Sequence, residues 1–155
     1  MEIGWKEWVS LPDLKVPAIK AKIDTGARTS ALHTFHIEPF KKDGMNMVKF
    51  HIHPLQRKKD IVIICTKQVV DKRIVRDSGG HEEERYVIMT NLLLGGKKWR
   101  IEVTLTDRDD MMFRMLLGRT AIRHKNIKIN PDKSYLTGKS LSKTYKKLVA
   151  SKVSR

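Results

Sequence analysis

The sequence lacks the features that would place it in an oxidising compartment or a membrane. Of its 155 residues only Cys65 is a cysteine, so the chain cannot form an internal disulfide. No segment approaches the roughly 20 apolar residues of a membrane-spanning helix. The first ten residues include Glu2, Lys6 and Glu7 and have no continuous apolar run of the kind found in signal peptides. We therefore expect a cytoplasmic protein that is not inserted in a membrane.

Acidic residues are also scarce relative to basic ones. Lysine and arginine number 32 against 17 for aspartate and glutamate, which gives a net charge of +15. From Lys133 to the C-terminus there are seven cations and no acid. Such a tail favours contact with phosphate, for example RNA or the ribosome, or with an acidic protein. The alternative is a solvated chain end, in which Leu141, Tyr145 and Leu148 recur at helical spacing.

Hydrophobic residues make up 40% of the chain, enough for one core at this length. We expect one domain over residues 1–136 and a basic tail over residues 137–155. Most of residues 15–106 reads as short strands, because β-branched and aromatic residues alternate with polar ones between Gly, Pro and Asp clusters. Residues 48–52 alternate in this way, whereas the continuous apolar run at 61–65 predicts a strand covered on both sides.

Two hairpins are predicted further along the chain. Residues 69–76 and 84–94 flank a polar, glycine-containing tip at 77–81, which is typical of a long hairpin that can move. Gly95 and Gly96 fit a two-residue turn into the next alternating stretch, since both accept positive φ.

The remainder is an apolar stretch at 111–117, a helical turn at 119–124 and a weak strand at 127–136. The sum is a mainly-β single domain built from hairpins and closed by a short helix.

The most informative segment is a strand that stops at an acid. Ile19, Ala21 and Ile23 alternate with lysines, and the pattern ends at Asp24-Thr25-Gly26. A glycine beside the carboxylate lets another chain or a water molecule approach closely, and a threonine can hydrogen-bond to the turn backbone. A turn-capping aspartate at a strand end is the alternative interpretation.

Four strings together resemble a known family. They are IGWKEWVSLP at 3–12, AKIDTGARTSAL at 21–32, RYVI at 85–88 and LLGR at 116–119. In this order, with the hairpin tip between them, they resemble a retroviral-type aspartic protease (retropepsin) protomer. Within that group they resemble the bacterial proteins called ATP-dependent zinc proteases, which are associated with the ligase that adds glutamates to a ribosomal protein. The resemblance implies a retropepsin-like β-barrel with a short C-terminal helix.

The resemblance also implies an acid–base mechanism that needs two carboxylates sharing one proton. The chain has one Asp-Thr-Gly, so the second Asp24 would come from another copy in a homodimer. Thr25 would brace the pair and Gly26 would leave room for substrate. The tip, with Ser78 and Gly79, would close over a peptide. Gly118 would pack behind the catalytic turn, and Arg119 would have a structural role.

The leading hypothesis is thus an aspartic peptidase acting on acidic peptides such as glutamate tails, because a surface of charge +15 attracts carboxylates. The candidates for binding the carboxylates of the substrate are Arg28, Arg76 and Arg85. Ser78 and Gly79 at the tip are further candidates for substrate binding.

Two other classes remain open. One is a basic RNA- or ribosome-binding module with a vestigial protease site. The other is a zinc peptidase, although there is no His-Glu-x-x-His motif, and Lys49 shares the strand face of His51 and His53. The acids Asp107, Asp109 and Asp110 favour a solvated loop over a metal site. We therefore assign no metal and no cofactor.

Overall fold

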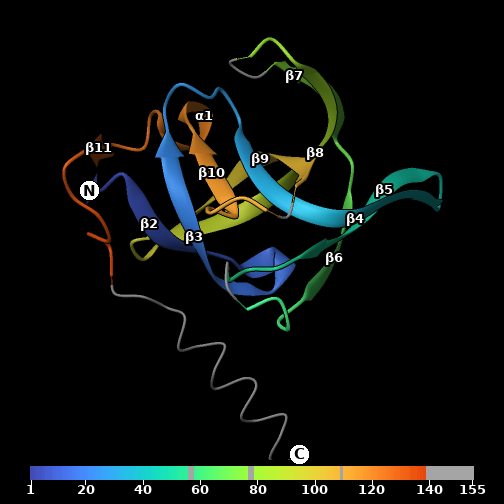
Figure 1. Cartoon of the computed structure of the whole chain (residues 1–155), viewed down its shortest axis with the longest axis horizontal. Helices are drawn as coiled ribbons and strands as arrows, with labels where there is room; N and C mark the ends of the chain where they lie inside the picture. The colour runs from blue at the N-terminus through green and yellow to red at the C-terminus, as the bar shows by residue number, and fades with distance from the viewer. Residues whose placement is uncertain (56–57, 77–78, 109, 139–155) are drawn as a thin grey trace, which may run out of the picture.

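Short strands dominate the computed structural model, which describes residues 1–55, 58–76, 79–108 and 110–138 (Figure 1). The only α-helix in these ranges is α1 (Arg119–Ile122), and a 3-10 helix, η1, spans Pro12–Leu14. The strands are β1 (Glu2–Ile3), β2 (Lys6–Leu11), β3 (Val16–Asp24), β4 (Ser30–Lys42), β5 (Met45–Ile52), β6 (Ile63–Gln68), β7 (Asp71–Arg76), β8 (Glu82–Leu94), β9 (Lys97–Asp107), β10 (Met115–Gly118) and β11 (Lys128–Ile129).

The main sheet closes on itself through β10. Its order is β10-β3-β2-β8-β9-β4-β5-β6, and β10 pairs with β4 as well as with β3. Strand β10 therefore lies between two strands from the first part of the chain, parallel to β3 and antiparallel to β4. Because the path from β10 round to β4 returns to β10, these strands form a barrel. The predicted mainly-β barrel with a short helix is confirmed.

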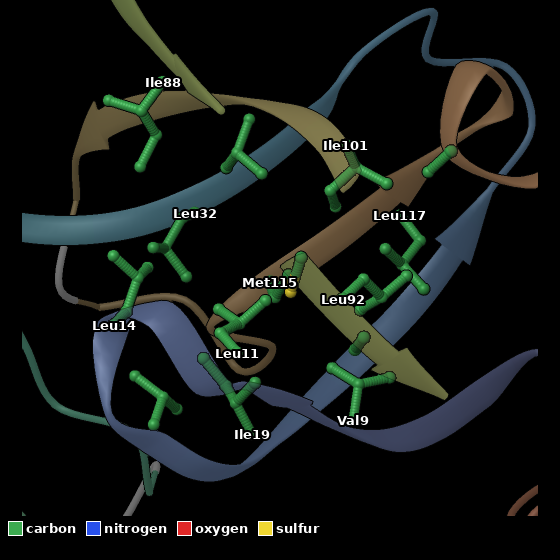
Figure 2. Close-up of a cluster of buried hydrophobic side chains, with 14 of the residues drawn as sticks. Val9, Leu11, Leu14, Ile19, Leu32, Ile88, Leu92, Ile101, Met115 and Leu117 are labelled. Atoms are coloured by element: carbon green, nitrogen blue, oxygen red, sulfur yellow. The ribbon is translucent and has the colours of Figure 1, made fainter. Parts of the chain in front are cut away.

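The core fills this barrel with apolar side chains contributed by strands and helix alike (Figure 2). The labelled residues come from β2, η1, β3, β4, β8, β9 and β10, and all are at most 4% exposed: Val9, Leu11, Leu14, Ile19, Leu32, Ile88, Leu92, Ile101, Met115 and Leu117. Inward residues alternate with outward ones along β2, as the period of two requires, whereas β9 is buried on both faces from Val103 to Thr106.

Both predicted hairpins are present. Strands β7 and β8 pair antiparallel from Asp71 opposite Val87 to Arg76 opposite Glu82. Strand β7 forms no other strand pair within the described residues, so it lies at an edge. The second hairpin joins β8 to β9 through Gly95 and Gly96, whose φ angles of 59° and 79° match a turn that needs positive φ at both positions.

Two predicted strands differ in the structure. Residues 61–65 are not covered on both sides, since Val62 and Ile64 are 43% and 58% exposed. The reason is position: β6 is the outermost strand of the main sheet order, in the arm formed with β4 and β5. The predicted strand at 127–136 shortens to Lys128–Ile129, because Asn130 accepts bonds from the Asp132 and Lys133 amides in a tight turn.

The last described residues are tied back to β2 by a buried acid. Glu7 is 0% exposed, and its carboxylate accepts bonds from the amides of Gly4, Leu136 and Thr137 and from the Thr137 hydroxyl at 2.7–3.0 Å. The predicted helix around Leu141, Tyr145 and Leu148, with nearly all of the basic tail, lies outside the described residues. In the part of the chain that is described, no helix has the length and apolarity needed to cross a membrane.

Candidate active site

Asp24 ends β3 at a turn that its own atoms help to fix. The Gly26 amide donates to Asp24 Oδ1 at 3.2 Å, and the Ala27 amide donates to the Asp24 carbonyl at 3.2 Å. The other carboxylate oxygen makes no bond within the described residues, and the side chain is only half-buried. Thr25 and Gly26 are exposed beside it. An acid held by its backbone and open on one side is suited to contact a water molecule or another chain.

Gly118 lies directly behind this turn. It is opposite Asp24 in the parallel pairing of β10 with β3, and its amide donates to Ser30 Oγ at 3.0 Å. A Cβ at this position would stand 2.6 Å from the Thr29 carbonyl carbon and 2.9 Å from the Ser30 nitrogen. Only glycine allows such an approach without moving backbone. The expected packing of Gly118 behind the turn is confirmed.

The first residues of α1 complete the support. The Arg119 amide donates to the Ala27 carbonyl at 2.9 Å, and the Thr120 amide donates to the Arg28 carbonyl at 3.1 Å. The Arg119 guanidinium reaches the carbonyls of Thr25 and Gly26 at 3.5 and 3.3 Å. Arg119 thus binds the backbone of the Asp24 turn, in the structural role the sequence predicted.

The residues predicted to bind substrate carboxylates lie in two different regions of the structure. Arg28 is exposed and follows the Asp24 turn directly. Arg76 and Arg85 lie on the β7–β8 hairpin, where each is paired with a glutamate of that hairpin: Arg76 with Glu82, and Arg85 with Glu83 at 3.1 Å. Gly79 is exposed at the tip, and Ser78 lies outside the described residues. The structure therefore gives the hairpin arginines internal carboxylate partners.

The sequence reasoning missed an ion pair between the hairpin and the barrel. Both Nη atoms of Arg73 on β7 donate to the Glu102 carboxylate on β9, at 2.6 and 3.1 Å, and Nε donates to Asp71 at 2.9 Å. Arg73 hydrogen bonds lower the pKa of the Glu102 carboxyl, partial burial opposes this, and the charges of Arg73 and Arg28 lower it further. The alternation at 99–105 shows only that Glu102 lies on the polar face of its strand.

A second missed residue is His33 on β4, which is 4% exposed. Its Nδ1 lies 2.6 Å from Thr106 Oγ1, and its Nε2 is buried without a hydrogen-bond partner within the described residues. Burial lowers the pKa of His33 to about 4, and the charges of Arg85, Arg108 and Arg114 act in the same direction against Asp110. His33 is therefore neutral at physiological pH.

The histidines offer no built metal site. The Phe35 ring stacks on His53 at 4.2 Å between centroids and meets His51 edge-on at 5.3 Å, so an apolar ring contacts both imidazoles. Among the described residues no three His, Cys, Asp or Glu side chains gather where they could hold a metal ion. These residues do not fit the zinc that the name of the resembled proteins implies.

Comparison with known proteins identifies the family. A family model described as "Retropepsin-like aspartic endopeptidase RimB" matches residues 2–140. The chain belongs to the RimB-like family. This match covers the Asp24 turn, the β7–β8 hairpin and Gly118, and it confirms the retropepsin resemblance of the four strings.

Relatives of the RimB-like chain are found among longer proteins. A probable alpha-L-glutamate ligase of Shewanella pealeana is 47% identical over 136 residues, and one of Desulfotalea psychrophila is 46% identical over 149 residues. These matches take in 88% and 94% of this chain but only 30% and 32% of the relatives, so the chain spans about a third of their length. A solved structure from Legionella pneumophila, of a protein with unknown function, has a TM-score of 0.72 and 29% identity over 88% of this chain and 97% of that one.

Proposed function

We propose that this RimB-like protein is an aspartic peptidase that works as a homodimer, with Asp24 of each subunit at a shared centre. The observation that carries the proposal is the Asp24 turn: a half-buried carboxylate beside an exposed glycine, supported from behind by Gly118, in a chain of a retropepsin-like endopeptidase family. Since the chain contains one Asp-Thr-Gly, the second carboxylate must come from a second copy.

The chemistry follows from two acids that share one proton. Two carboxylates a few ångströms apart cannot both be ionised, so one is charged and the other protonated. The charged Asp24 takes a proton from a water molecule, whose oxygen attacks the peptide carbonyl carbon. The protonated Asp24 donates to the carbonyl oxygen as charge develops there, and a proton then passes to the leaving nitrogen as the C–N bond breaks. The exposed Gly26 leaves room for the water and the substrate backbone.

The substrate class that we propose is an acidic peptide, such as a glutamate tail. Two observations support this choice. The chain carries a net charge of +15, which attracts and orients carboxylates. In addition, its relatives are named probable alpha-L-glutamate ligases, proteins whose name implies a glutamate-containing product.

A cleavage assay on hexaglutamate tests the reaction. The wild type is expected to cut the peptide, and Asp24→Asn, which keeps the size of the side chain and removes the acid, is expected to lose at least about a thousandfold in rate because it cannot act as the base. The matched control is Asp43→Asn, an exposed acid in the β4–β5 turn, which should retain full activity. Equal activity of Asp24→Asn and wild type would exclude the aspartic mechanism.

A mixing experiment tests the shared centre. When equal amounts of wild type and Asp24→Asn exchange subunits, about one quarter of the dimers keep two Asp24 residues. Activity per total protein should therefore fall to about one quarter, whereas independent sites in single subunits would retain one half. A molecular mass in solution of one chain under assay conditions would also count against the homodimer.

A further inference from the structure

The Arg73–Glu102 pair connects the β7–β8 hairpin to the barrel. The other hairpin pairs, Arg76 with Glu82, Arg85 with Glu83 and Lys72 with Glu84, stay within β7 and β8. Arg73 also binds Asp71 within β7 through Nε, but both of its Nη atoms reach Glu102 on β9, the two-pronged geometry in which a guanidinium binds a carboxylate most specifically. The pair therefore resembles a carboxylate-binding site that already holds a carboxylate.

This site lies on a short path from Asp24. Gly118 is opposite Asp24, and its amide donates to Ser30 Oγ. The Ser30 carbonyl accepts a bond from Thr104 Oγ1 at 3.1 Å. Thr104 and Glu102 are two residues apart on β9, so their side chains are on the same face of the sheet. Glu102 is thus on the face that adjoins the candidate catalytic turn.

Arg28, in the Asp24 turn, acts electrostatically on the same carboxylate. Strand β4 begins to pair with β9 where Ser30 meets Val103, which places residues 28 and 29 beside the strand position of Glu102. The positive charge of Arg28 is among those that act on Glu102. Glu102 is therefore bound by a cation of the hairpin and also influenced by the charge of a cation in the Asp24 turn. Both members of the pair remain partly open to solvent, with side chains 33% and 39% exposed.

We propose, on the basis of the proposed peptidase function, that Arg73 reads an acidic side chain of the substrate and that Glu102 occupies Arg73 until substrate arrives. The substrate carboxylate takes the place of the Glu102 carboxylate on the guanidinium. Because the pair is partly open to water, separating Arg73 from Glu102 costs little free energy. The incoming carboxylate makes the same two bonds again, so the free energies before and after the exchange are similar. Glu102 acts as an internal competitor that lowers affinity for acidic peptides and excludes neutral ones, which cannot displace it.

The test is a double-mutant cycle in binding. Labelled hexaglutamate is titrated against Asp24→Asn protein, which cannot cut it, and against the same protein with Glu102→Gln, Arg73→Gln or both. We expect Glu102→Gln to tighten the dissociation constant about fivefold and Arg73→Gln to weaken it about tenfold, since a charge-assisted two-pronged contact is gained or lost. In the Arg73→Gln protein, Glu102→Gln should change binding less than about twofold, because the competitor then has nothing to occupy.

A charge-matched control separates competition from a general gain in positive charge. Glu84→Gln removes one hairpin carboxylate that holds Lys72 and not Arg73, and it should leave the dissociation constant within about twofold. Equal tightening by Glu84→Gln and Glu102→Gln would overturn the proposal. So would a Glu102→Gln effect that persists without Arg73, and so would weaker binding by Glu102→Gln, which is the result expected of a purely structural link. Thermal unfolding of each variant verifies that it is folded.

The outcome for the reaction stays separate from the outcome for the site. If wild type fails to cut hexaglutamate while the cycle behaves as expected, the peptidase function fails and the carboxylate exchange at Arg73 stands. If wild type cuts the peptide and the cycle is flat, the peptidase stands and the exchange is wrong. Absence of hexaglutamate binding by every variant would also refute the exchange.

Discussion

The Asp24 turn and the β7–β8 hairpin are held by different kinds of contact. Backbone amides and carbonyls fix the turn, with Gly118 packed directly against it. In the hairpin, backbone pairing joins β7 to β8, and ion pairs of charged side chains add to it, with arginines that range from 17% to 69% exposed. Backbone contacts at van der Waals distance tolerate almost no change, whereas exposed ion pairs are weak and exchangeable.

The difference suits the two roles proposed for these regions. A catalytic carboxylate must be held within a fraction of an ångström, and the rigid turn provides this for Asp24. A segment that closes over a substrate must open again, so its contacts have to be individually weak. In Figure 1 the end of β3, α1 and β7 lie at the same end of the molecule, as a catalytic turn and its cover require.

Gly118→Ala should give the largest loss of stability, because the new methyl group would stand within 3 Å of backbone atoms of Thr29 and Ser30 that cannot rotate away. We expect unfolding to become easier by about 3 kcal/mol, the upper end of the range for overpacking. Chemical denaturation measures this.

The matched variant in the hairpin is Gly80→Ala. Gly80 has φ of +84° and no atom within 4 Å of an added Cβ, so only backbone strain of about 1 kcal/mol is expected. A loss for Gly118→Ala no larger than that for Gly80→Ala would remove the distinction between the two regions.

The second prediction concerns His33, whose protonation is opposed by the positive charge of Arg85 on the hairpin. Its pKa is about 4 when folded against 6.5 for the free side chain, so the unfolded chain binds more protons between these values. Stability is therefore full above pH 6.5 and declines as the pH falls toward 4, by about 3 kcal/mol in total. Denaturation from pH 7 to 4 should show this slope for wild type and lose it for His33→Asn.

His124→Asn is the control for that slope. His124 is exposed and has φ of +64°, a conformation that asparagine accepts readily. This variant should follow the wild-type pH dependence, and a shared loss of slope in both variants would show that His33 is not its source.

Glu7→Gln tests the buried side-chain contact of the barrel. Its two carboxylate oxygens accept four bonds, and the amide group that replaces one of them would point a donor at backbone donors. We expect a loss of about 2 kcal/mol. Hydrogen exchange at the amides of Leu136 and Thr137 should accelerate as well. The exposed Glu2→Gln keeps an amide oxygen that can still accept the bond from Asn130, so it should have a much smaller effect.

The fold was largely predictable because its signals are local. Alternation along β5 and β9, and the Gly95-Gly96 turn, depend on residues that are neighbours in sequence. Strand β6 could not be placed in the same way, because an apolar run has the same appearance in a central strand and in the outermost one. The strand expected at 127–136 was overridden by the Asn130 turn, whose side-chain bond has no periodic signature.

The site was predictable where the constraint is on backbone. Asp24 and Gly118 could be singled out because a tight turn and a close approach demand particular residue types. Arg73 and Glu102 could not, since they are 29 residues apart and meet across strands. The pairing of each hairpin arginine with a particular glutamate depends on side-chain rotamers, which leave no local pattern in the sequence. The burial of His33 has no local sequence pattern either.

The smallest effect is expected at the hairpin pair Arg76–Glu82. Their side chains are 69% and 49% exposed, so water and salt screen the attraction and both side chains lose rotamer freedom in pairing. A double-mutant cycle with Arg76→Gln and Glu82→Gln should give a coupling energy of about 0.5 kcal/mol or less, and less still at high salt. A coupling above about 1 kcal/mol, insensitive to salt, would mean that the hairpin is held as firmly as the turn, since exposed pairs do not reach that value. The contrast between a fixed Asp24 and an openable cover would then be lost.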